Sequence, residues 1–591
     1  MPTPLSVYRE NILQYQETLR KIKKQLLVSS IFRLTVFLVF GVLIYLAAGN
    51  TKLLTACILA GIALFLFLVS RHSNLQWKKR QLEELIALNE TEIRVLDRCY
   101  GDLPDGDEFA DPGHAFSQDT DLFGDRSFFQ YLNRTALLPG RQKLAGFLTS
   151  NDTSAIPQKQ EAVRELGEKL RFRQEFTAVA RMIRTETNPE TVINWLQAYQ
   201  PFVSGLMPWI HRAFWMGSVV LTVLYFTDMV SGYALFLLFL TGLAMTSVRL
   251  KKINALAVQV SKAQDTFSQY HRLLAHIEEE TFSSAMLREA QARVKQSSLQ
   301  ASATLKRFSK IIDALEQRNN FIFGALGNGF LLWDLYQSYR LEKWMMAYRH
   351  HVEDWFDVIH FTDAFNTLGN FRFNHPDYTF PVINSGAYIL KTVRGAHPLI
   401  DPAEVVKNDY AIHREEFFIV TGANMAGKST FLRTVSLQIV MGNAGLPVCA
   451  EACEYNPVKL ITSMRTVDSL ADEASYFYAE LRRLKYIVDA IGKEEYFIIL
   501  DEILKGTNST DKAIGSRKFV EKLVASDATG IIATHDLSLC EVADKIPQVK
   551  NYYFDAEIVN DELYFDYTFK EGICRNMNAS FLLRKMKITD D

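Results

Sequence analysis

A short apolar segment that runs into a glycine-rich turn constrains the fold of this chain most. Residues 417–420 are followed, after one threonine, by the pattern GxxxxGK[ST] over residues 422–429. That pattern needs a β-strand before the turn and a helix after it, because turn amides and the helix amino end together form an anion site. Two further apolar runs, 497–500 and 530–533, alternate with helical sequence. Over residues 389–591 the sequence therefore predicts an α/β domain with a parallel sheet covered by helices on both faces.

The turn offers the groups that a nucleoside triphosphate and its metal ion need. The residues expected to contact the nucleotide are Gly422, Ala423, Asn424, Met425, Ala426, Gly427, Lys428, Ser429 and Thr430. Glycines let backbone amides surround the phosphates, Lys428 can reach the β- and γ-phosphates, and Ser429 can bind Mg²⁺. The expected cofactors are therefore ATP and Mg²⁺.

Polar residues end the other two apolar runs. Asp501 and Glu502 follow residues 497–500, and His535 comes shortly after residues 530–533. Asp501 is expected to hold Mg²⁺ with Ser429, and Glu502 to orient or deprotonate the attacking water. His535 can contact the γ-phosphate or that water. The predicted enzyme is a Mg²⁺-dependent ATPase whose catalytic residues are Glu502, His535 and Lys428.

These motifs resemble those of the MutS family, whose phosphate loop reads TGxNMxGKST where this chain has TGANMAGKST. Residues 465–480 are similar to the family's dimer-signature stretch, and residues 504–511 to its Gly-Thr-Ser turn. The resemblance implies a homodimer in which Ser475 reaches the γ-phosphate at the partner's site. Asp472 and Glu473 depart from the family, which prefers a basic residue and a glycine there. Weaker similarity from about residue 119 implies the family's helical core.

DNA binding is a further implication of the resemblance, and two features weaken it. The formal net charge is −2, whereas proteins that coat DNA are usually basic. No segment before residue 119 resembles the family's wedge domain with its Phe-x-Glu motif, and little sequence remains for long levers and a clamp. We therefore expect DNA binding to be weak and salt-sensitive, without mismatch recognition.

Two regions are too apolar for surface helices. The first comprises residues 34–48 and 53–69, and the second comprises residues 213–227 and 230–248. Each region is expected to form a hairpin of two transmembrane helices. Lys and Arg flank both hairpins, whereas the turns hold only Lys52 and Asp228, which places the long segments in the cytoplasm. We expect an integral protein of the cell or inner membrane, in contact with the lipid bilayer, with its ATPase domain cytoplasmic. The alternative is two pairs of helices buried in a soluble core.

These features divide the chain into five expected parts. They are N-terminal helices with the first hairpin (1–118), the first part of a MutS-like helical core (119–206), the second hairpin (207–250), the rest of the core and lever (251–388) and the ATPase domain (389–591). The expected fold class is thus an α/β P-loop ATPase domain joined to an all-α core and lever domain with four transmembrane helices.

Other kinds of function fit the sequence less well. A transporter-type ATPase half shares the phosphate loop but needs an LSGGQ-like signature, which residues 468–480 do not provide. A membrane scaffold with a vestigial ATPase does not require the intact Lys428, Asp501 and His535. The six cysteines form no CxxC pair and no Cys/His cluster with zinc spacing, so no zinc site is expected.

Overall fold

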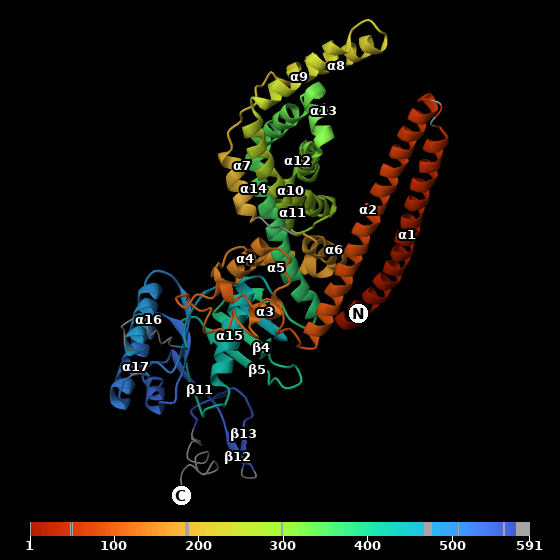
Figure 1. Cartoon of the computed structure of the whole chain (residues 1–591). Coiled ribbons are helices and arrows are strands. Elements are labelled where there is room, and N and C mark those ends of the chain that lie inside the picture. The colour runs from red at the N-terminus through yellow and green to blue at the C-terminus, as the bar shows by residue number, and fades with distance from the viewer. Residues whose placement is uncertain are drawn as a thin grey trace. The chain divides into compact units, whose positions relative to one another are not determined.

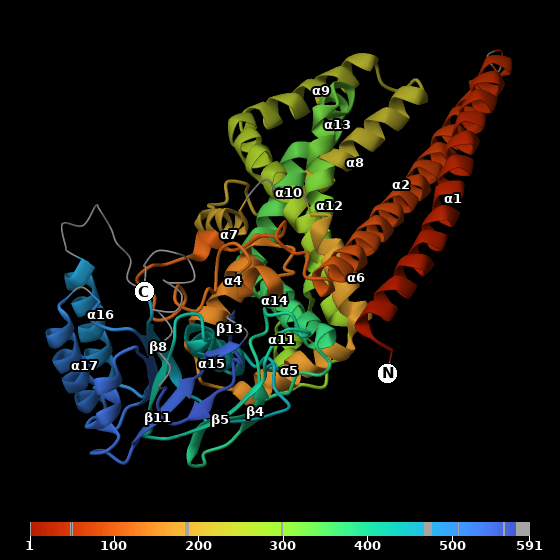
Figure 2. The same ribbon diagram turned by 90° about the horizontal axis from the view of Figure 1, so that it is seen from below.

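A computed structural model describes residues 2–47, 49, 51–183, 188–296, 299–465, 476–505, 507–559 and 562–574 (Figures 1 and 2). The chain divides into two compact units, each assembled from separate segments. The helical unit comprises Met1–Ile93, Arg171–Ser283 and Leu287–Asp363. The mixed α/β unit comprises Arg94–Leu170, Ser284–Met286 and Ala364–Asp591. The five-part division expected above stays a prediction.

Long helices build the helical unit. They are α1 (Pro4–Leu46), α2 (Thr51–Leu96), α6 (Leu170–Arg181), α7 (Pro189–Ala198), α8 (Met207–Phe226), α9 (Gly232–Ser247), α10 (Leu250–Glu279), α11 (Ala285–Val294), α12 (Ala301–Glu316), η2 (Gln317–Asn319), α13 (Phe321–Leu331) and α14 (Trp333–Asn374), with the short pair β1 (Lys295–Gln296) and β2 (Leu299–Gln300). Helices α10, α12 and α14 meet at an aromatic core. The Phe267 ring lies 4.6 Å from that of Phe308, which lies 4.0 Å from Trp344. Burial of such large rings holds the three helices together.

Helices α1 and α2 form an antiparallel hairpin. His72 Nδ1 lies 3.3 Å from Ser29 Oγ near its middle, and Asn11 Nδ2 donates to Asn89 Oδ1 at 3.2 Å near its open end. Helices α8 and α9 form the second hairpin, so two helical hairpins lie where the sequence predicts them. Among the described residues, however, only α1 is long and apolar enough to cross a membrane.

The expectation of four transmembrane helices is therefore corrected. The count rises to two if α9 and the start of α10, bent by 65° at their junction, form one span. Helix α9 has 16 residues. At about 1.5 Å per residue it covers about 24 Å, short of a hydrocarbon core of about 30 Å. Hydropathy alone shows neither this length nor the bend.

A third apolar helix, α13, packs against the second hairpin. A Cβ placed on Gly242 of α9 would lie 2.7 Å from the Asn328 carbonyl oxygen, so only glycine permits this approach. Ser218 Oγ of α8 donates to the Phe330 carbonyl at 2.8 Å, which satisfies a helix-end group in apolar surroundings. Phe321 and Ile322 of α13 are exposed. The sequence analysis placed this helix in the core and lever part, residues 251–388, and that assignment stays a prediction.

Two sheets organise the mixed α/β unit. A six-stranded sheet has the order β14-β11-β6-β10-β9-β8, and a four-stranded sheet has the order β3-β7-β4-β5. The strands are β3 (Val382–Ile383), β4 (Tyr388–Gly395), β5 (Asn408–His413), β6 (Phe417–Gly422), β7 (Ala452–Tyr455), β8 (Lys459–Ser463), β9 (Tyr496–Asp501), β10 (Thr529–Ala533), β11 (Val549–Phe554) and β14 (Lys570–Glu571), with the small pair β12 (Glu557–Val559) and β13 (Glu562–Tyr564). Strands β8, β9, β10, β6 and β11 are parallel, as predicted, and β14 is antiparallel.

The helices of this unit come from both ends of its sequence. They are η1 (Asp107–Phe109), α3 (Phe128–Leu132), α4 (Leu138–Thr149), α5 (Ile156–Glu168), α15 (Lys428–Asn443), α16 (Tyr476–Ile491), α17 (Ser509–Val524) and η3 (Leu537–Val542). Every residue of β6 is buried, as expected for a central parallel strand. Asn151, after α4, donates to the Leu460 carbonyl of β8 at 2.9 Å. The segment from Arg94 to Leu170 is thus an integral part of this unit.

Candidate functional site

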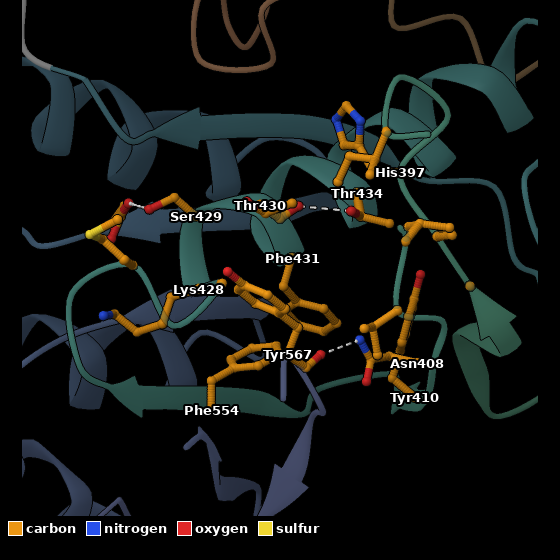
Figure 3. Close-up of a pocket in the computed structure, with 18 of the residues that line it drawn as sticks. His397, Asn408, Tyr410, Lys428, Ser429, Thr430, Phe431, Thr434, Phe554 and Tyr567 are labelled. Carbon is orange, nitrogen blue, oxygen red and sulfur yellow. Dashed lines mark hydrogen bonds between the residues drawn. The ribbon is translucent and has the colours of Figure 1, made fainter. Parts of the chain in front are cut away.

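A cavity of about 500 Å³ lies where β6, β9 and β10 end (Figure 3). Nine of the predicted site residues line it: Asn424, Met425, Gly427, Lys428, Ser429, Thr430, Asp501, Glu502 and His535. Gly422, Ala423 and Ala426 belong to the same turn but do not line the cavity. Ser475 and its neighbours Asp472 and Glu473 lie outside the described residues.

The turn between β6 and α15 depends on two glycines. Gly422 has φ of +149°, and a Cβ there would lie 2.6 Å from the Phe554 carbonyl oxygen of β11. Gly427 has φ of +108° and caps the amino end of α15. Side chains disfavour such backbone conformations, so glycine is required at both positions. The turn thereby places the amino end of α15 at the cavity, where the helix dipole favours an anion.

Lys428 supplies the positive charge at this turn. Its ammonium group donates to the carbonyls of Gly422 at 2.8 Å and Ala423 at 3.0 Å. Its Nζ also lies 3.3 Å from His535 Nε2. Burial lowers the pKa of Lys428, while Asp501 and Glu502 favour its charged form. The ammonium group is therefore held at the turn beside His535, where an anion bound by the turn amides would lie close to it.

Ser429 and Asp501 join the first turn of α15 to the end of β9. Ser429 Oγ donates to Asp501 Oδ2 at 2.8 Å. Burial raises the pKa of Asp501 because it disfavours the charged carboxylate. A nearby cation would stabilise that charge. A hydroxyl and a carboxylate are oxygen ligands suited to Mg²⁺, which commonly takes its other ligands from phosphates and water. These two residues therefore fit the predicted metal site.

Glu502 and His535 form a second polar pair. His535 Nε2 lies 2.8 Å from Glu502 Oε1, and Lys505 Nζ lies 3.7 Å from Glu502 Oε2. The hydrogen bond from His535 is the main reason why the pKa of Glu502 falls to about 2. A carboxylate with so low a pKa is a weak base but a stable hydrogen-bond acceptor. This geometry favours orienting a water molecule over removing its proton.

Sequence reasoning gave Glu480 no role, yet it supports the site. Its buried carboxylate accepts hydrogen bonds from the backbone amides of Leu504 and Lys505, the latter at 3.1 Å. It thereby fixes the turn that follows Glu502. The sequence feature that could have identified Glu480 is its position as a carboxylate within an amphipathic helix, α16. The apolar face of this helix covers the sheet.

An aromatic wall was also missed. Tyr410, Phe431, Phe554 and Tyr567 line the cavity beside the turn (Figure 3), and the rings of Phe431 and Phe554 lie 5.6 Å apart. Asn408 Nδ2 donates to the Tyr567 carbonyl at 3.0 Å, which holds this wall together. The four aromatic residues come from β5, α15, β11 and the segment before β14. Such a wall suits a planar ring. No local sequence motif predicts the wall, because its residues come from separate elements.

Two aspartates connect the N-terminal segment of this unit to the site. Asp119 accepts hydrogen bonds from Thr462 Oγ1 at 2.6 Å and from the amides of Met464 and Arg465 at 3.1 and 2.8 Å. Asp121 bridges Arg465 at 2.7 Å and Arg433 of α15 at 3.1 Å. The start of the segment that leads to residues 466–475 is thus tied to the helix that follows the turn.

Comparison with known proteins supports a MutS-family protein. Residues 418–586 match the family described as MutS domain V. The chain is 32% identical over 201 residues to DNA mismatch repair protein MutS 2 of Halobacterium salinarum, covering 33% of this chain and 23% of that protein. It is 30% identical over 197 residues to MutS protein homolog 4 of Homo sapiens, covering 31% and 21%. It is 27% identical over 345 residues to DNA mismatch repair protein MutS of Desulfatibacillum aliphaticivorans, covering 56% and 35%.

The chain therefore spans only about a fifth to a third of the length of these relatives. The mixed α/β sheets and many helices described above fit a MutS-like fold. Because members of this family are ATPases, the matches support ATPase activity at a general level.

The lowered pKa of Glu502 predicts how the stability of the fold changes in acid. Glu502 is charged to a lower pH in the folded chain than at its ordinary pKa of 4.5, so it stabilises the fold above that pH and loses this contribution as the pH falls toward 2. Between neutral pH and about pH 3, the wild type should lose more unfolding free energy than Glu502→Gln, measured by urea titration. Glu557→Gln, an exposed control on β12, should behave as the wild type. Equal losses in the wild type and Glu502→Gln would contradict the assignment.

Proposed function

We propose that this chain is a membrane-anchored ATPase of the MutS type that hydrolyses ATP with Mg²⁺ and acts as a homodimer. One observation carries the catalytic part of the proposal. The glycine-rich turn, the Ser429–Asp501 pair and the Glu502–His535 pair come from three neighbouring parallel strands and line one cavity. The match of residues 418–586 to MutS domain V supports the same conclusion.

Each residue at the cavity has a distinct task in this proposal. The turn amides and Lys428 bind the triphosphate, and the aromatic wall receives the base. Ser429 and Asp501 hold Mg²⁺, which neutralises phosphate charge when bound. Glu502 orients the attacking water by accepting a hydrogen bond from it. His535 fixes the Glu502 carboxylate and lies close enough to Lys428 to contact the same phosphate.

Dimerisation rests on the resemblance of residues 465–480 to the dimer-signature stretch of the family. Asp119 and Asp121 anchor the beginning of that stretch, and α16 continues from its end. In the proposed dimer Ser475 contacts the γ-phosphate bound by the partner subunit. Asp472 and Glu473 would add negative charge near that contact, where the family prefers a basic residue and a glycine. The contact of Ser475 is therefore the part of the proposal that departs most from the family pattern.

Membrane anchoring rests on the surface of the first hairpin. Five large apolar side chains of α1 are 57 to 72% exposed: Leu34, Phe37, Leu38, Val42 and Leu46. Exposed apolar surface on this scale is unfavourable in water and favourable in lipid. If α1 crosses the bilayer, the antiparallel α2 beside it must return. Lys and Arg at the open end of the hairpin then place the ATPase domain in the cytoplasm.

The second apolar cluster, formed by α8, α9 and α13, contacts the same membrane in this proposal. Phe226, Met229 and Tyr233 at the turn of the hairpin are 74 to 80% exposed. Because α9 is short, we propose that this cluster enters the bilayer without adding two full spans.

DNA is proposed only as a weak ligand. Two of the similar proteins are named as DNA mismatch repair proteins. The net charge of −2 argues against strong phosphate binding by this chain. No comparison favours the transporter-type alternative, and the scaffold alternative does not account for the paired residues at the cavity.

The catalytic roles predict different effects for two substitutions. Lys428→Ala should lose ATP binding, whereas Glu502→Gln should keep ATP binding and lose about 100-fold or more in turnover, because the water loses its orienting carboxylate. Binding is measured with a fluorescent ATP analogue and turnover by phosphate release. Glu494→Gln, before the opposite end of β9, is the matched control and should retain both. Normal turnover by Glu502→Gln, or tight ATP binding by Lys428→Ala, refutes the roles.

The proposed topology predicts which cysteines react from outside sealed cells. A cysteine introduced at Gly49, in the turn of the first hairpin, should react with a membrane-impermeant maleimide. The native Cys99 is exposed and should be protected, as should a cysteine introduced at Asn508. The protein should also stay with the membrane in alkaline carbonate. Labelling at Asn508, or release by carbonate, overturns the topology.

We also predict that this protein does not distinguish a mismatch from paired DNA. A mismatch reader bends the duplex and inserts an aromatic wedge, which needs a dedicated domain. Residues Pro4–Leu46 and Thr51–Leu96 form the α1–α2 hairpin, which has no such wedge architecture. Affinities for a G·T-containing duplex and its paired control, measured at about 0.15 M salt, should agree within a factor of a few. A tenfold preference, about 1.4 kcal/mol, would reveal a recognition element.

A further inference from the structure

We propose that a groove in the helical unit binds a small phosphorylated anion. The groove lies between α2, α6, α10 and α12 and encloses about 900 Å³, more than the cavity at the glycine-rich turn. Sites for small molecules usually measure about 300 to 1,000 Å³. The groove shares no lining residue with the ATPase cavity, so the inference goes beyond the proposed ATPase.

Four cationic side chains line the groove: Arg80 of α2, Arg272 of α10, and Lys306 and Lys310 of α12. None of them forms an ion pair with a described carboxylate, whereas Arg293 on α11 pairs with both Asp354 and Asp357 at 2.9 Å. Lys306 and Lys310 are one helical turn apart, a spacing at which like charges destabilise a helix. Such a cluster is unfavourable by itself and is stabilised by an anion.

The acidic residues at the groove offset only part of this charge. Glu279 and Asp313 line it, and Asp313 Oδ1 already accepts a hydrogen bond from Gln264 at 2.6 Å. The lining therefore keeps an excess of two positive charges. An anion with two or more negative charges, such as a phosphate ester or a diphosphate, matches that excess.

Neutral groups add hydrogen-bonding capacity and shape. His271 lines the groove, and its Nδ1 is buried without a hydrogen-bond partner among the described residues. Burial, aided by Arg272 and Lys306, lowers the pKa of His271 to about 4, so the ring is neutral at neutral pH and can donate or accept one hydrogen bond. The Arg272 guanidinium lies 4.4 Å from the centre of the Trp77 ring, which orients it along one wall.

The phosphate group has two possible sources, a soluble metabolite and a lipid headgroup. Trp77 is eight residues beyond residue 69, where the apolar part of α2 ends. Eight residues of helix cover about 12 Å. Headgroup regions extend roughly 5 to 8 Å beyond the hydrocarbon core. If the hairpin inserts as proposed, the groove lies just outside the headgroups, a position that favours the soluble source.

The test measures pyrophosphate binding to the full-length protein in a neutral detergent by calorimetry. All variants carry Lys428→Ala, which removes binding at the glycine-rich turn and separates this test from that of the ATPase. We expect about one equivalent of pyrophosphate to bind, and Lys306→Ala with Lys310→Ala to weaken binding at least tenfold. Arg307→Ala removes one charge from the same helix outside the groove and should change affinity less than twofold. Thermal unfolding checks that each variant is folded.

Absence of pyrophosphate binding in the Lys428→Ala background, or equal affinity in all variants, overturns the proposal. Displacement of pyrophosphate by a short DNA duplex that depends on the same lysines also overturns it, because the ligand would then be nucleic acid. Nanodiscs distinguish the two sources of phosphate. Weaker pyrophosphate binding in phosphatidylglycerol discs than in phosphatidylcholine discs supports the site with a lipid headgroup as ligand. Equal binding in both supports it with a soluble ligand.

Discussion

The parallel register of three strands is the constraint on which the candidate site depends. Ala533 of β10 pairs with Val420 of β6 on one side and with Asp501 of β9 on the other. Because the strands run in the same direction, the residues that follow each of them emerge at one edge of the sheet. The glycine-rich turn, Glu502 and His535 are therefore brought together by backbone hydrogen bonds rather than by their own contacts.

Asp501 and Glu502, at the end of β9, show how adjacent carboxylates can have different properties. Burial raises the pKa of Asp501, whereas the hydrogen bond from His535 lowers that of Glu502. Opposite shifts in neighbouring acids are a common way to separate their roles. A cation near Asp501 would therefore offset the cost of burying its charge, whereas the Glu502 carboxylate is already stabilised by its hydrogen bond. These surroundings support the proposed division of roles, with metal binding by Asp501 and water orientation by Glu502.

Local sequence patterns predicted which residues would come together at the cavity, while the roles assigned to them stay predictions. Residues 422–430, Asp501 and His535 lie at or shortly after the ends of apolar strands, so the strand order brings them to one edge of the sheet. Glu480 and the aromatic wall escaped prediction because each depends on contacts between residues far apart in the chain. The number of transmembrane helices was predicted wrongly for a related reason. Hydropathy measures how apolar a segment is, but the 65° bend after α9 and the packing of α13 on Gly242 are tertiary features.

The bridge made by Asp121 ties three segments of the mixed α/β unit to one another. One carboxylate holds Arg433, in the helix that begins at the glycine-rich turn, and Arg465, at the start of the segment toward residues 466–475. Asp121 itself belongs to the segment from Arg94 to Leu170, so the bridge joins that segment to two later parts of the same unit. Thermodynamic reciprocity requires that if filling the cavity displaces Asp121, then displacing Asp121 changes affinity at the cavity by the same factor.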